Sequence, residues 1–296
     1  MLSTVLNRWE DFRDLTSGPK SHLKAVADFL ETHPAVIYHG DSWFSTPLYP
    51  NLARQSAEAI DGIRMIVGKP GAQAKELFDR KSVQTFARRI ADLPFDVLCL
   101  SAGGNDLLGD RLIDLFKLWH DGRPAKISAA DAFDRIVSNG AFARLRGRYA
   151  LMLDALLALK KRERPKHVIG HSYVPLHRIG QAGGLTIDNI GLIAILKGDV
   201  GPWLYGPMKR VLASPVDAKV FADLLLVNGF KETVLAPLKQ QYDGFFDYVD
   251  LAQANLNQTQ DWYDEIHPTA AGFAQCKALL NAALRAALPQ KAGKIA

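Results

Sequence analysis

The stretch that decides the fold is Ala35-Val36-Ile37-Tyr38-His39-Gly40-Asp41-Ser42-Trp43, in which an apolar run leads into small and polar residues. The apolar run predicts a short buried strand, and glycine lets the backbone turn tightly where that strand ends. The next polar side chains then lie at the carboxyl edge of a sheet, where open α/β folds keep their sites. We therefore interpret Ser42 as a candidate nucleophile.

Apolar and helical patterns alternate along the rest of the chain. Strands are predicted at residues 35–38, 63–67, 97–101, 167–173 and 246–251, and helical patterns between them at 51–60, 74–90 and 149–161. Strands separated by helices predict a parallel sheet covered on both faces. The predicted fold class is α/β, a three-layer α/β/α arrangement around about five parallel strands.

The chain divides into a leader and one large domain. Residues 1–34 are predicted as an amino-terminal helical leader whose helix Ser21 can cap, and residues 35–290 as a single domain. Two stretches, at about 107–147 and 176–243, are longer than a crossover requires and are interpreted as insertions. The second is a cap over the substrate pocket if it lies above the carboxyl edge of the sheet, or else a structural appendage away from the site.

Composition limits the classes of partner. The 296 residues include 36 basic and 31 acidic ones, a net charge of +5, with no block of five like charges, which disfavours nucleic acid. Arg144, Arg146 and Arg148 are interpreted as a solvated helix face rather than a phosphate site. Cys99 and Cys276 fall inside apolar patterns and are predicted to fill the core, with no disulfide or cysteine metal site.

The sequence shows neither the pattern of a secretory signal nor that of a membrane span. Acidic residues occupy the amino-terminal positions where a secretory signal has its apolar region, and apolar runs such as 155–159 stop well short of the ~20 residues of a membrane span. We therefore expect a cytoplasmic protein without integral membrane association. Its oligomeric state is left open.

A second group of polar residues stands near the other end of the chain, in Trp262-Tyr263-Asp264-Glu265-Ile266-His267-Pro268. A hydroxyl nucleophile, an imidazole base and a carboxylate that orients the base are the parts of a serine hydrolase site. Because Asp264 and His267 are three residues apart, one turn can supply both. Together with Ser42 they are predicted to form a catalytic triad.

Four sequence blocks occur in a specific order. They are Gly40-Asp41-Ser42 after the first predicted strand, Gly71 in Gly68-Lys69-Pro70-Gly71-Ala72 after the second, Gly103-Gly104-Asn105-Asp106 after the third, and Asp264-Glu265-Ile266-His267-Pro268 before the last helix. This ordered set, over residues 35–285, resembles the SGNH/GDSL hydrolase family. The resemblance implies a flavodoxin-like fold of that family.

The resemblance also implies a role for each residue. Ser42 would attack an ester carbonyl, His267 would act as general base and acid, and Asp264 would fix the imidazole tautomer. The oxyanion hole would consist of the backbone N–H groups of Ser42 and Gly71 and the side-chain amide of Asn105. This chemistry requires no metal and no organic cofactor.

Other residues near the blocks have weaker predictions. Trp43 and Trp262 are candidates for lining an acyl or alcohol pocket, although core packing is at least as well supported for each. Asp41 is expected to stabilise the turn through nearby N–H groups. Glu265 is adjacent to Asp264, so it points away from the imidazole in an extended segment.

Other residues in the chain are compatible with two further kinds of site. Gly170-His171-Ser172-Tyr173-Val174 is similar to a nucleophile elbow, but valine replaces its second glycine. Asp41, Asn105 and Asp106 with several histidines suggest a metallophosphoesterase, for which further ligands at the strand ends are missing. The sequence favours a serine esterase acting on small-molecule esters with short- to medium-chain acyl groups. Alternatives are a carbohydrate O-acetylesterase and a catalytically inactive binding module.

Overall fold

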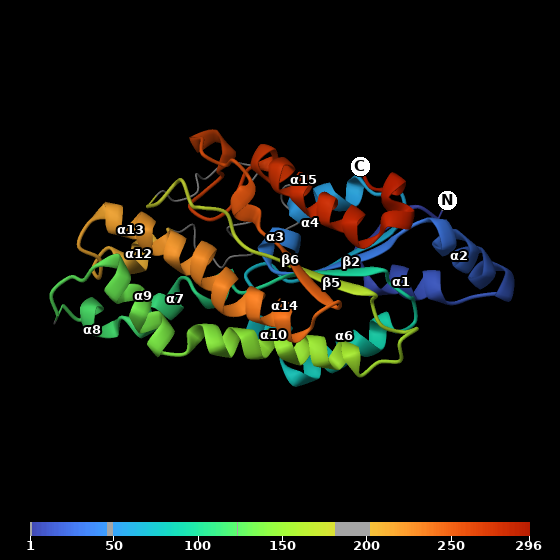
Figure 1. Ribbon diagram of the computed structural model, residues 1–296, viewed down its shortest axis with the longest axis horizontal. Helices are drawn as coiled ribbons and strands as arrows, with labels where there is room; N and C mark the ends of the chain where they lie inside the picture. Colours follow the sequence, from blue (N-terminus) through green and yellow to red (C-terminus); the bar gives the residue numbers. More distant parts are fainter. Residues whose placement is uncertain (1, 46–49, 123, 181–201) are drawn as a thin grey trace.

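A six-stranded parallel sheet forms the centre of the fold (Figure 1). The structure is a computed structural model that describes residues 2–45, 50–122, 124–180 and 202–296. In spatial order the strands are β1 (Thr4–Leu6), β3 (Ile63–Gly68), β2 (Ala35–Gly40), β4 (Val97–Ser101), β5 (His167–His171) and β6 (Phe246–Val249). All neighbouring strands run parallel, which confirms the predicted α/β class.

The central strands are buried along their whole length, as expected for a sheet covered on both faces. Every residue of β2 and of β4 is buried, which explains why both read as continuous apolar runs rather than alternating ones. The prediction for β4 was correct to the residue. The predictions for β5 and β6 each extended two residues too far.

The predicted helical leader also contributes a strand. β1 pairs with β3 at the edge of the sheet, and the helices α1 (Trp9–Thr16) and α2 (Lys20–Thr32) follow it. The sequence missed β1 because three residues are too few to show a period. Ser21 does not cap α2: the helix begins one residue before it, and Pro19 is the capping position, without a side-chain hydrogen bond.

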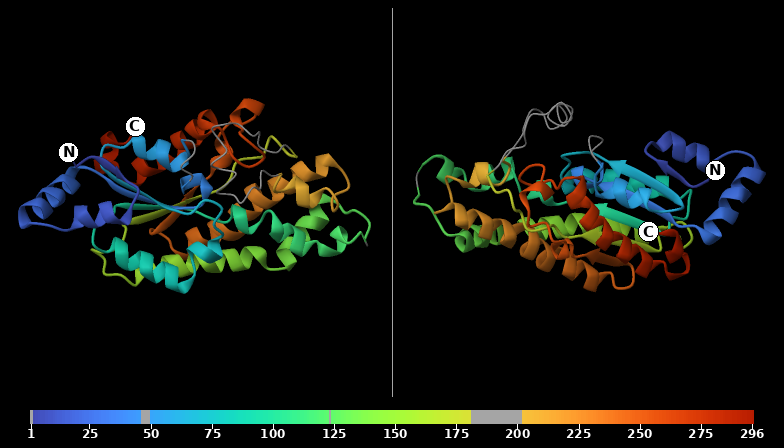
Figure 2. Two further views of the ribbon diagram at one scale, coloured as in Figure 1. Left: turned by 180° about the vertical axis from the view of Figure 1, so that it is seen from behind. Right: turned by 90° about the horizontal axis from the view of Figure 1, so that it is seen from above.

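Helices cover both faces of the sheet (Figures 1 and 2). One face carries α4 (Leu52–Glu58) and α15 (Ala270–Ala287), and the other carries α6 (Arg80–Ile90), α10 (Ala141–Leu157) and α14 (Ala236–Gln241). The helix predicted at 74–90 is two helices, α5 (Ala74–Leu77) and α6. It divides because the Asp79 carboxylate accepts hydrogen bonds from the N–H groups of Lys81 and Ser82 and so caps a new helix.

Residues 110–122 and 124–138 of the first insertion and 205–222 of the second lie side by side beyond the carboxyl ends of the strands (Figure 1). Ile127 joins them through backbone hydrogen bonds to Val211 (2.8 Å) and from Ala213 (3.1 Å). Their helices are α7 (Asp110–Leu115), α8 (Lys117–His120), α9 (Ala129–Ser138), α12 (Tyr205–Met208) and α13 (Pro215–Ala222). The apolar segment 190–196, on which the prediction of short- to medium-chain acyl esters rests, lies outside the described residues.

Short helical turns complete the chain. Two π-helical turns, η3 (Asp223–Gly229) and η4 (Lys231–Leu235), join α13 to α14. The remaining short elements are α3 (Ser42–Ser45), η1 (Gly104–Asp106), η5 (Leu251–Gln253), η6 (Thr259–Asp261) and η7 (Pro289–Lys294). Cys99 and Cys276 are both buried and unpaired.

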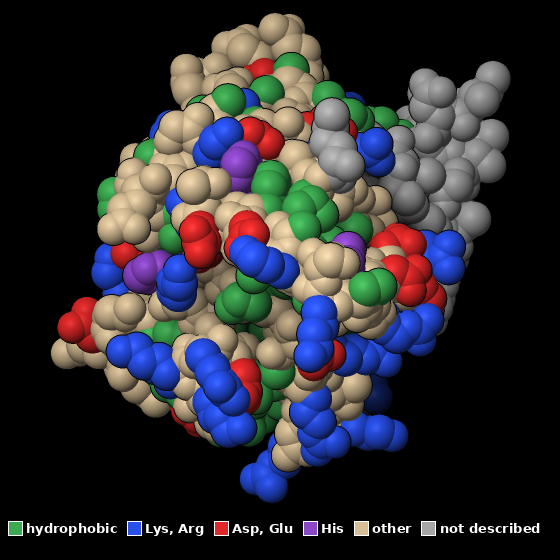
Figure 3. Space-filling model, turned by 90° about the vertical axis from the view of Figure 1, so that its right-hand side faces the viewer, with side chains coloured by type: hydrophobic (Ala, Val, Ile, Leu, Met, Phe, Trp, Pro, Cys, Tyr) green, Lys and Arg blue, Asp and Glu red, His purple; other side chains and the backbone are tan. Residues whose placement is uncertain are grey.

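The surface charge is mixed. At the end of the molecule that carries both termini, basic side chains gather in the lower half of the view, among acidic and apolar ones (Figure 3). Within the described residues, no helix has the length and apolar character needed to cross a membrane.

Candidate functional site

Ser42 lies where β2 ends, as the first residue of the short helix α3. Gly40 is required just before it because β2 and β4 come very close: a Cβ atom at position 40 would collide with the backbone carbonyl of Ser101. The Asp41 N–H then donates to that same carbonyl at 2.9 Å. This junction fixes the direction in which the Ser42 side chain leaves the sheet.

The Ser42 hydroxyl meets His267, which is 225 positions away in the sequence. The Oγ atom of Ser42 lies 2.9 Å from Nε2 of His267, and both side chains are buried. On the other side of the ring, Nδ1 lies 2.8 Å from Oδ2 of Asp264. The structure thus brings the three residues of the predicted triad into one hydrogen-bonded chain.

The loop that carries Asp264 and His267 is closed on itself. Oδ1 of Asp264 accepts hydrogen bonds from the N–H groups of Ile266 (2.8 Å) and His267 (2.7 Å). An isolated antiparallel bridge between Trp262 and Pro268 ties the two ends of the loop. Because one carboxylate oxygen is held by the backbone, the other is aimed at the imidazole.

Electrostatics favour a basic imidazole. Burial lowers the pKa of His267, but the charge and hydrogen bond of Asp264 and the charge of Asp41 outweigh it, so the net shift is upward. Burial raises the pKa of Asp41 to about 6. As the sequence predicted, Asp41 stabilises the turn: its Oδ1 accepts hydrogen bonds from the Trp43 N–H (3.1 Å) and the Ser101 hydroxyl (2.8 Å).

The third block places Asn105 beside Ser42. Both residues line the same small cavity, and Nδ2 of Asn105 donates one hydrogen bond, of 3.0 Å, to the carbonyl of Ala72. An amide nitrogen carries two hydrogens, so this contact leaves the second for another acceptor. The bond also orients the amide by tying the third block to the second.

Gly71 lies in the turn from Lys69 to Ala72, which the Ala72 N–H closes onto the Lys69 carbonyl at 3.1 Å. Its φ of 72° follows a proline, the pattern of a type II turn. Gly71 is exposed and is not among the described residues that line the cavity at Ser42. Its part in an oxyanion hole stays a prediction.

The cavity at Ser42 is small and mostly apolar. Its volume is about 20 Å³, close to the space of a single water molecule. Leu226 enters it from the π-helical turn η3. The described lining residues are Asp41, Ser42, Trp43, Gly104, Asn105, Leu108, Tyr173, Leu176, Leu226 and Ile266.

The two tryptophans suggested by the sequence have different surroundings. Trp43 lines the cavity and packs against the rings of His171, Tyr173 and Phe273. Trp262 is buried, and its indole N–H donates to the Leu256 carbonyl at 3.0 Å. It is not among the described lining residues.

Glu265 is the site residue whose role the sequence could not supply. It points away from the imidazole, as expected, and its buried carboxylate accepts three backbone hydrogen bonds: from Gly180 (2.9 Å), Leu204 (2.7 Å) and Tyr205 (3.0 Å). Trp203, next to Leu204, packs edge-on against the ring of His267, with centroids 5.6 Å apart. Glu265 therefore holds the second insertion against the triad loop.

We expect Glu265→Gln to destabilise the protein by about 1–3 kcal/mol, because the amide turns its NH₂ group toward at least one of the three buried N–H donors. The free energy of unfolding in urea measures this loss. Glu58→Gln is the control, since Glu58 forms an exposed ion pair with Arg54 and should leave the unfolding midpoint unchanged. Equal stability of the two variants would contradict the assigned role of Glu265.

The rival sites are not assembled. The Ser172 hydroxyl donates to Asp250 at 2.8 Å and accepts from the Leu251 N–H at 2.9 Å, so it joins β5 to the segment after β6. Burial lowers the pKa of the neighbouring His171 to about 4. Among the described residues, no group of three or more His, Cys, Asp or Glu side chains could hold a metal ion.

The parallel α/β sheet thus places a buried serine and a buried histidine in hydrogen-bond contact beyond the carboxyl end of β2. No protein-family model and no curated protein matches the chain.

Solved structures similar to the chain include proteins described as esterases, at low sequence identity. A carbohydrate acetylesterase family member from Sinorhizobium meliloti is 16% identical over 86% of this chain and 99% of that one, with a TM-score of 0.43. A second carbohydrate acetylesterase from that organism is 12% identical over the same shares, with a TM-score of 0.47. The aryl esterase of M. smegmatis, in an inhibitor-bound form, is 13% identical over 86% and 100%, with a TM-score of 0.43.

Proposed function

We propose that the protein is a serine esterase that hydrolyses carboxylic esters through an acyl-enzyme on Ser42. The observation that carries this proposal is the buried hydrogen-bonded chain from Ser42 through His267 to Asp264. A hydroxyl is a weak nucleophile unless a base takes its proton as it attacks. A neutral imidazole 2.9 Å away, oriented by a carboxylate, supplies that base.

The reaction has two halves. Oγ of Ser42 bonds to the ester carbonyl carbon while its proton passes to Nε2 of His267, and the imidazolium returns that proton to the leaving alcohol as the C–O bond breaks. Water then attacks the acyl-enzyme with His267 again as base, which releases the acid and restores the Ser42 hydroxyl. The proposed donors to the oxyanion are the Ser42 and Gly71 backbone N–H groups and the second amide hydrogen of Asn105.

The size of the cavity at Ser42 favours a short acyl group. A volume of about 20 Å³ with mostly apolar walls suits the methyl group of an acetyl ester. A deacetylase of sugars would need the same acyl pocket, so the carbohydrate O-acetylesterase remains the second candidate. The proposal therefore names acetyl esters first and leaves the alcohol open between simple alcohols and sugars.

The test is the rate of hydrolysis of p-nitrophenyl esters from acetate to octanoate, together with a peracetylated sugar, with a chelator present. We expect kcat/KM for the acetate to exceed that for the octanoate by at least about tenfold, because added methylenes have no room. If the peracetylated sugar is hydrolysed faster than p-nitrophenyl acetate, the alcohol part of the substrate is a carbohydrate. No hydrolysis of any of these esters would overturn the proposal.

The pH dependence follows from His267, which must be neutral to accept the proton of Ser42. Since its pKa is raised above the ordinary 6.5, kcat/KM should fall as the pH drops through a value higher than 6.5. Asp41→Asn keeps an acceptor for Trp43 and Ser101 but removes a charge that raises this pKa, so its acid limb should move to lower pH. An acid limb below pH 6.5 in the unmodified protein would contradict this assignment.

A further inference from the structure

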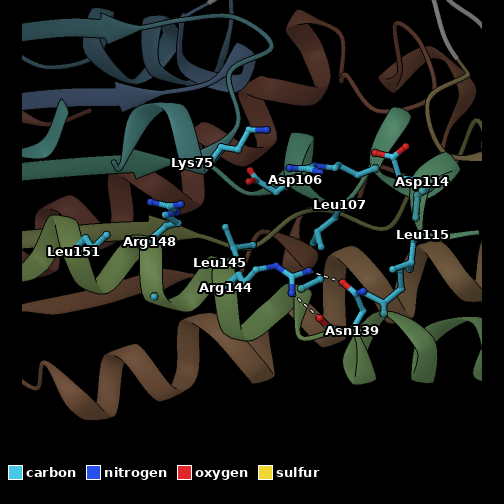
Figure 4. Close-up of a pocket in the computed structure, with 15 residues that line it drawn as sticks. Lys75, Asp106, Leu107, Asp114, Leu115, Asn139, Arg144, Leu145, Arg148 and Leu151 are labelled. Carbon is cyan, nitrogen blue, oxygen red and sulfur yellow. Dashed lines mark hydrogen bonds between the residues drawn. The ribbon is translucent and has the colours of Figure 1, made fainter. Parts of the chain in front are cut away.

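A second, much larger groove lies on the other side of the turn that carries Asn105. Its volume is about 800 Å³, and helix α10 forms one wall while α5, η1 and α7 form the other (Figure 4). It shares no described lining residue with the cavity at Ser42, although Asn105 lines that cavity and Asp106 lines this groove. Its size is that of a site for an organic molecule.

The charge of the groove is positive. Four cationic side chains face two carboxylates there: Lys75, Arg111, Arg144 and Arg148 against Asp106 and Asp114. Asp106 already accepts a 2.6 Å hydrogen bond from the Ala74 N–H. Among the described residues, none of the four cations forms an ion pair of 4.0 Å or less, and Arg144 donates hydrogen bonds to Asn139.

Helix α10 has two features on the side of the groove that disfavour the helix. Arg144 and Arg148 are one helical turn apart, so their like charges repel. Gly147 lies between them in the helix interior, where glycine is unfavourable, yet a Cβ atom there would meet nothing within 4 Å. Packing therefore does not require this glycine, and the open space that it leaves belongs to the groove.

Apart from Asn139, the rest of the lining is made of apolar residues and Gly147, with Leu107, Leu112 and Leu145 buried in the walls. Cations above an apolar floor fit a ligand with both characters. We propose that this groove binds an amphipathic organic anion, with an apolar body against the leucines and a phosphate or carboxylate group among Arg144, Arg148 and Lys75. This site stands apart from the proposed esterase function, because it neither includes Ser42 nor depends on turnover.

The experiment is calorimetric titration of the Ser42→Ala protein, which removes any turnover, with octyl phosphate, octanoate, 1-octanol and inorganic phosphate. We expect an octyl anion to bind more tightly than both 1-octanol and inorganic phosphate. Whichever of octyl phosphate and octanoate binds with the higher affinity identifies the anionic group that the groove prefers. Binding of 1-octanol as tight as that of either anion would overturn the proposal, and so would the absence of binding by both octyl anions.

Two variants locate the binding in the groove. The double variant Arg144→Gln with Arg148→Gln should lower the affinity for the octyl anion by about tenfold or more, which is the contribution of one charge-assisted contact. Gly147→Leu keeps all charges but fills the open space, and it should also lower the affinity for the octyl anion. The control, Lys160→Gln with Arg162→Gln, removes the same charge beyond the end of α10; an equal loss of affinity in this control would show unspecific attraction and overturn the assignment.

Discussion

Replacing Ser42 by alanine is expected to lower kcat for ester hydrolysis on the order of 10⁶-fold, the loss that follows removal of the nucleophile in a serine hydrolase. The proposed proton acceptor is in place for this hydroxyl, whose Oγ lies 2.9 Å from Nε2 of His267. The variant should still fold, because alanine removes one buried hydroxyl and leaves the backbone of the β2–α3 junction unchanged. Steady-state kinetics and circular dichroism measure the two effects.

Ser45→Ala is the matched control for this experiment. Ser45 lies in the same short helix, but its hydroxyl donates to the Asp41 carbonyl at 2.7 Å rather than to His267. Its kcat should stay near that of the unmodified protein. Turnover retained in Ser42→Ala, or lost equally in both variants, would contradict the nucleophile assignment.

Asp264→Asn is expected to lower kcat by about 10⁴-fold through the tautomer of His267. The backbone N–H groups of Ile266 and His267 both donate to Oδ1 of Asp264, so an asparagine must place its oxygen there. Its NH₂ group then faces Nδ1 of His267, which forces the ring proton onto Nε2. That nitrogen could no longer accept the proton of Ser42.

A second readout separates this role from a structural one. The carboxylate of Asp264 raises the pKa of His267, so the remaining activity of Asp264→Asn should have its acid limb at lower pH than in the unmodified protein. Unfolding in urea reports any loss of stability independently. A large fall in kcat without a shift of the acid limb would mean that Asp264 acts through the fold of the loop alone.

The central strands and the association of Ser42, Asp264 and His267 could be predicted from the sequence because their signals are local. Each strand is an apolar run bounded by small or polar residues, and each site residue directly follows a strand or precedes a helix. The edge strand β1 could not be predicted, since only its pairing with β3 makes three residues a strand. The break before α6 could have been predicted from the capping residue Asp79.

The surroundings of the site could not be predicted from the sequence, because they depend on contacts between distant segments. Nothing local in the sequence distinguishes Glu265 from other acidic residues. Its role follows from the backbone N–H groups of Gly180, Leu204 and Tyr205, which donate to its carboxylate. The packing of Trp203 on His267 is equally long-range. Arg148 was interpreted as part of a solvated face, and only the two walls of the groove show that it lines a hollow.

The wide separation of Ser42 and His267 along the chain also bears on biogenesis. The two residues are 225 positions apart, and α15, which follows His267, is tied to α4 by the hydrogen bond from Ser56 to Asn281. Under the proposed mechanism, a ribosome-bound chain that has not yet released residue 267 has the nucleophile but no base, and should not hydrolyse esters. Ester turnover would thus report complete tertiary assembly, so its recovery after dilution from urea would time the final step of refolding.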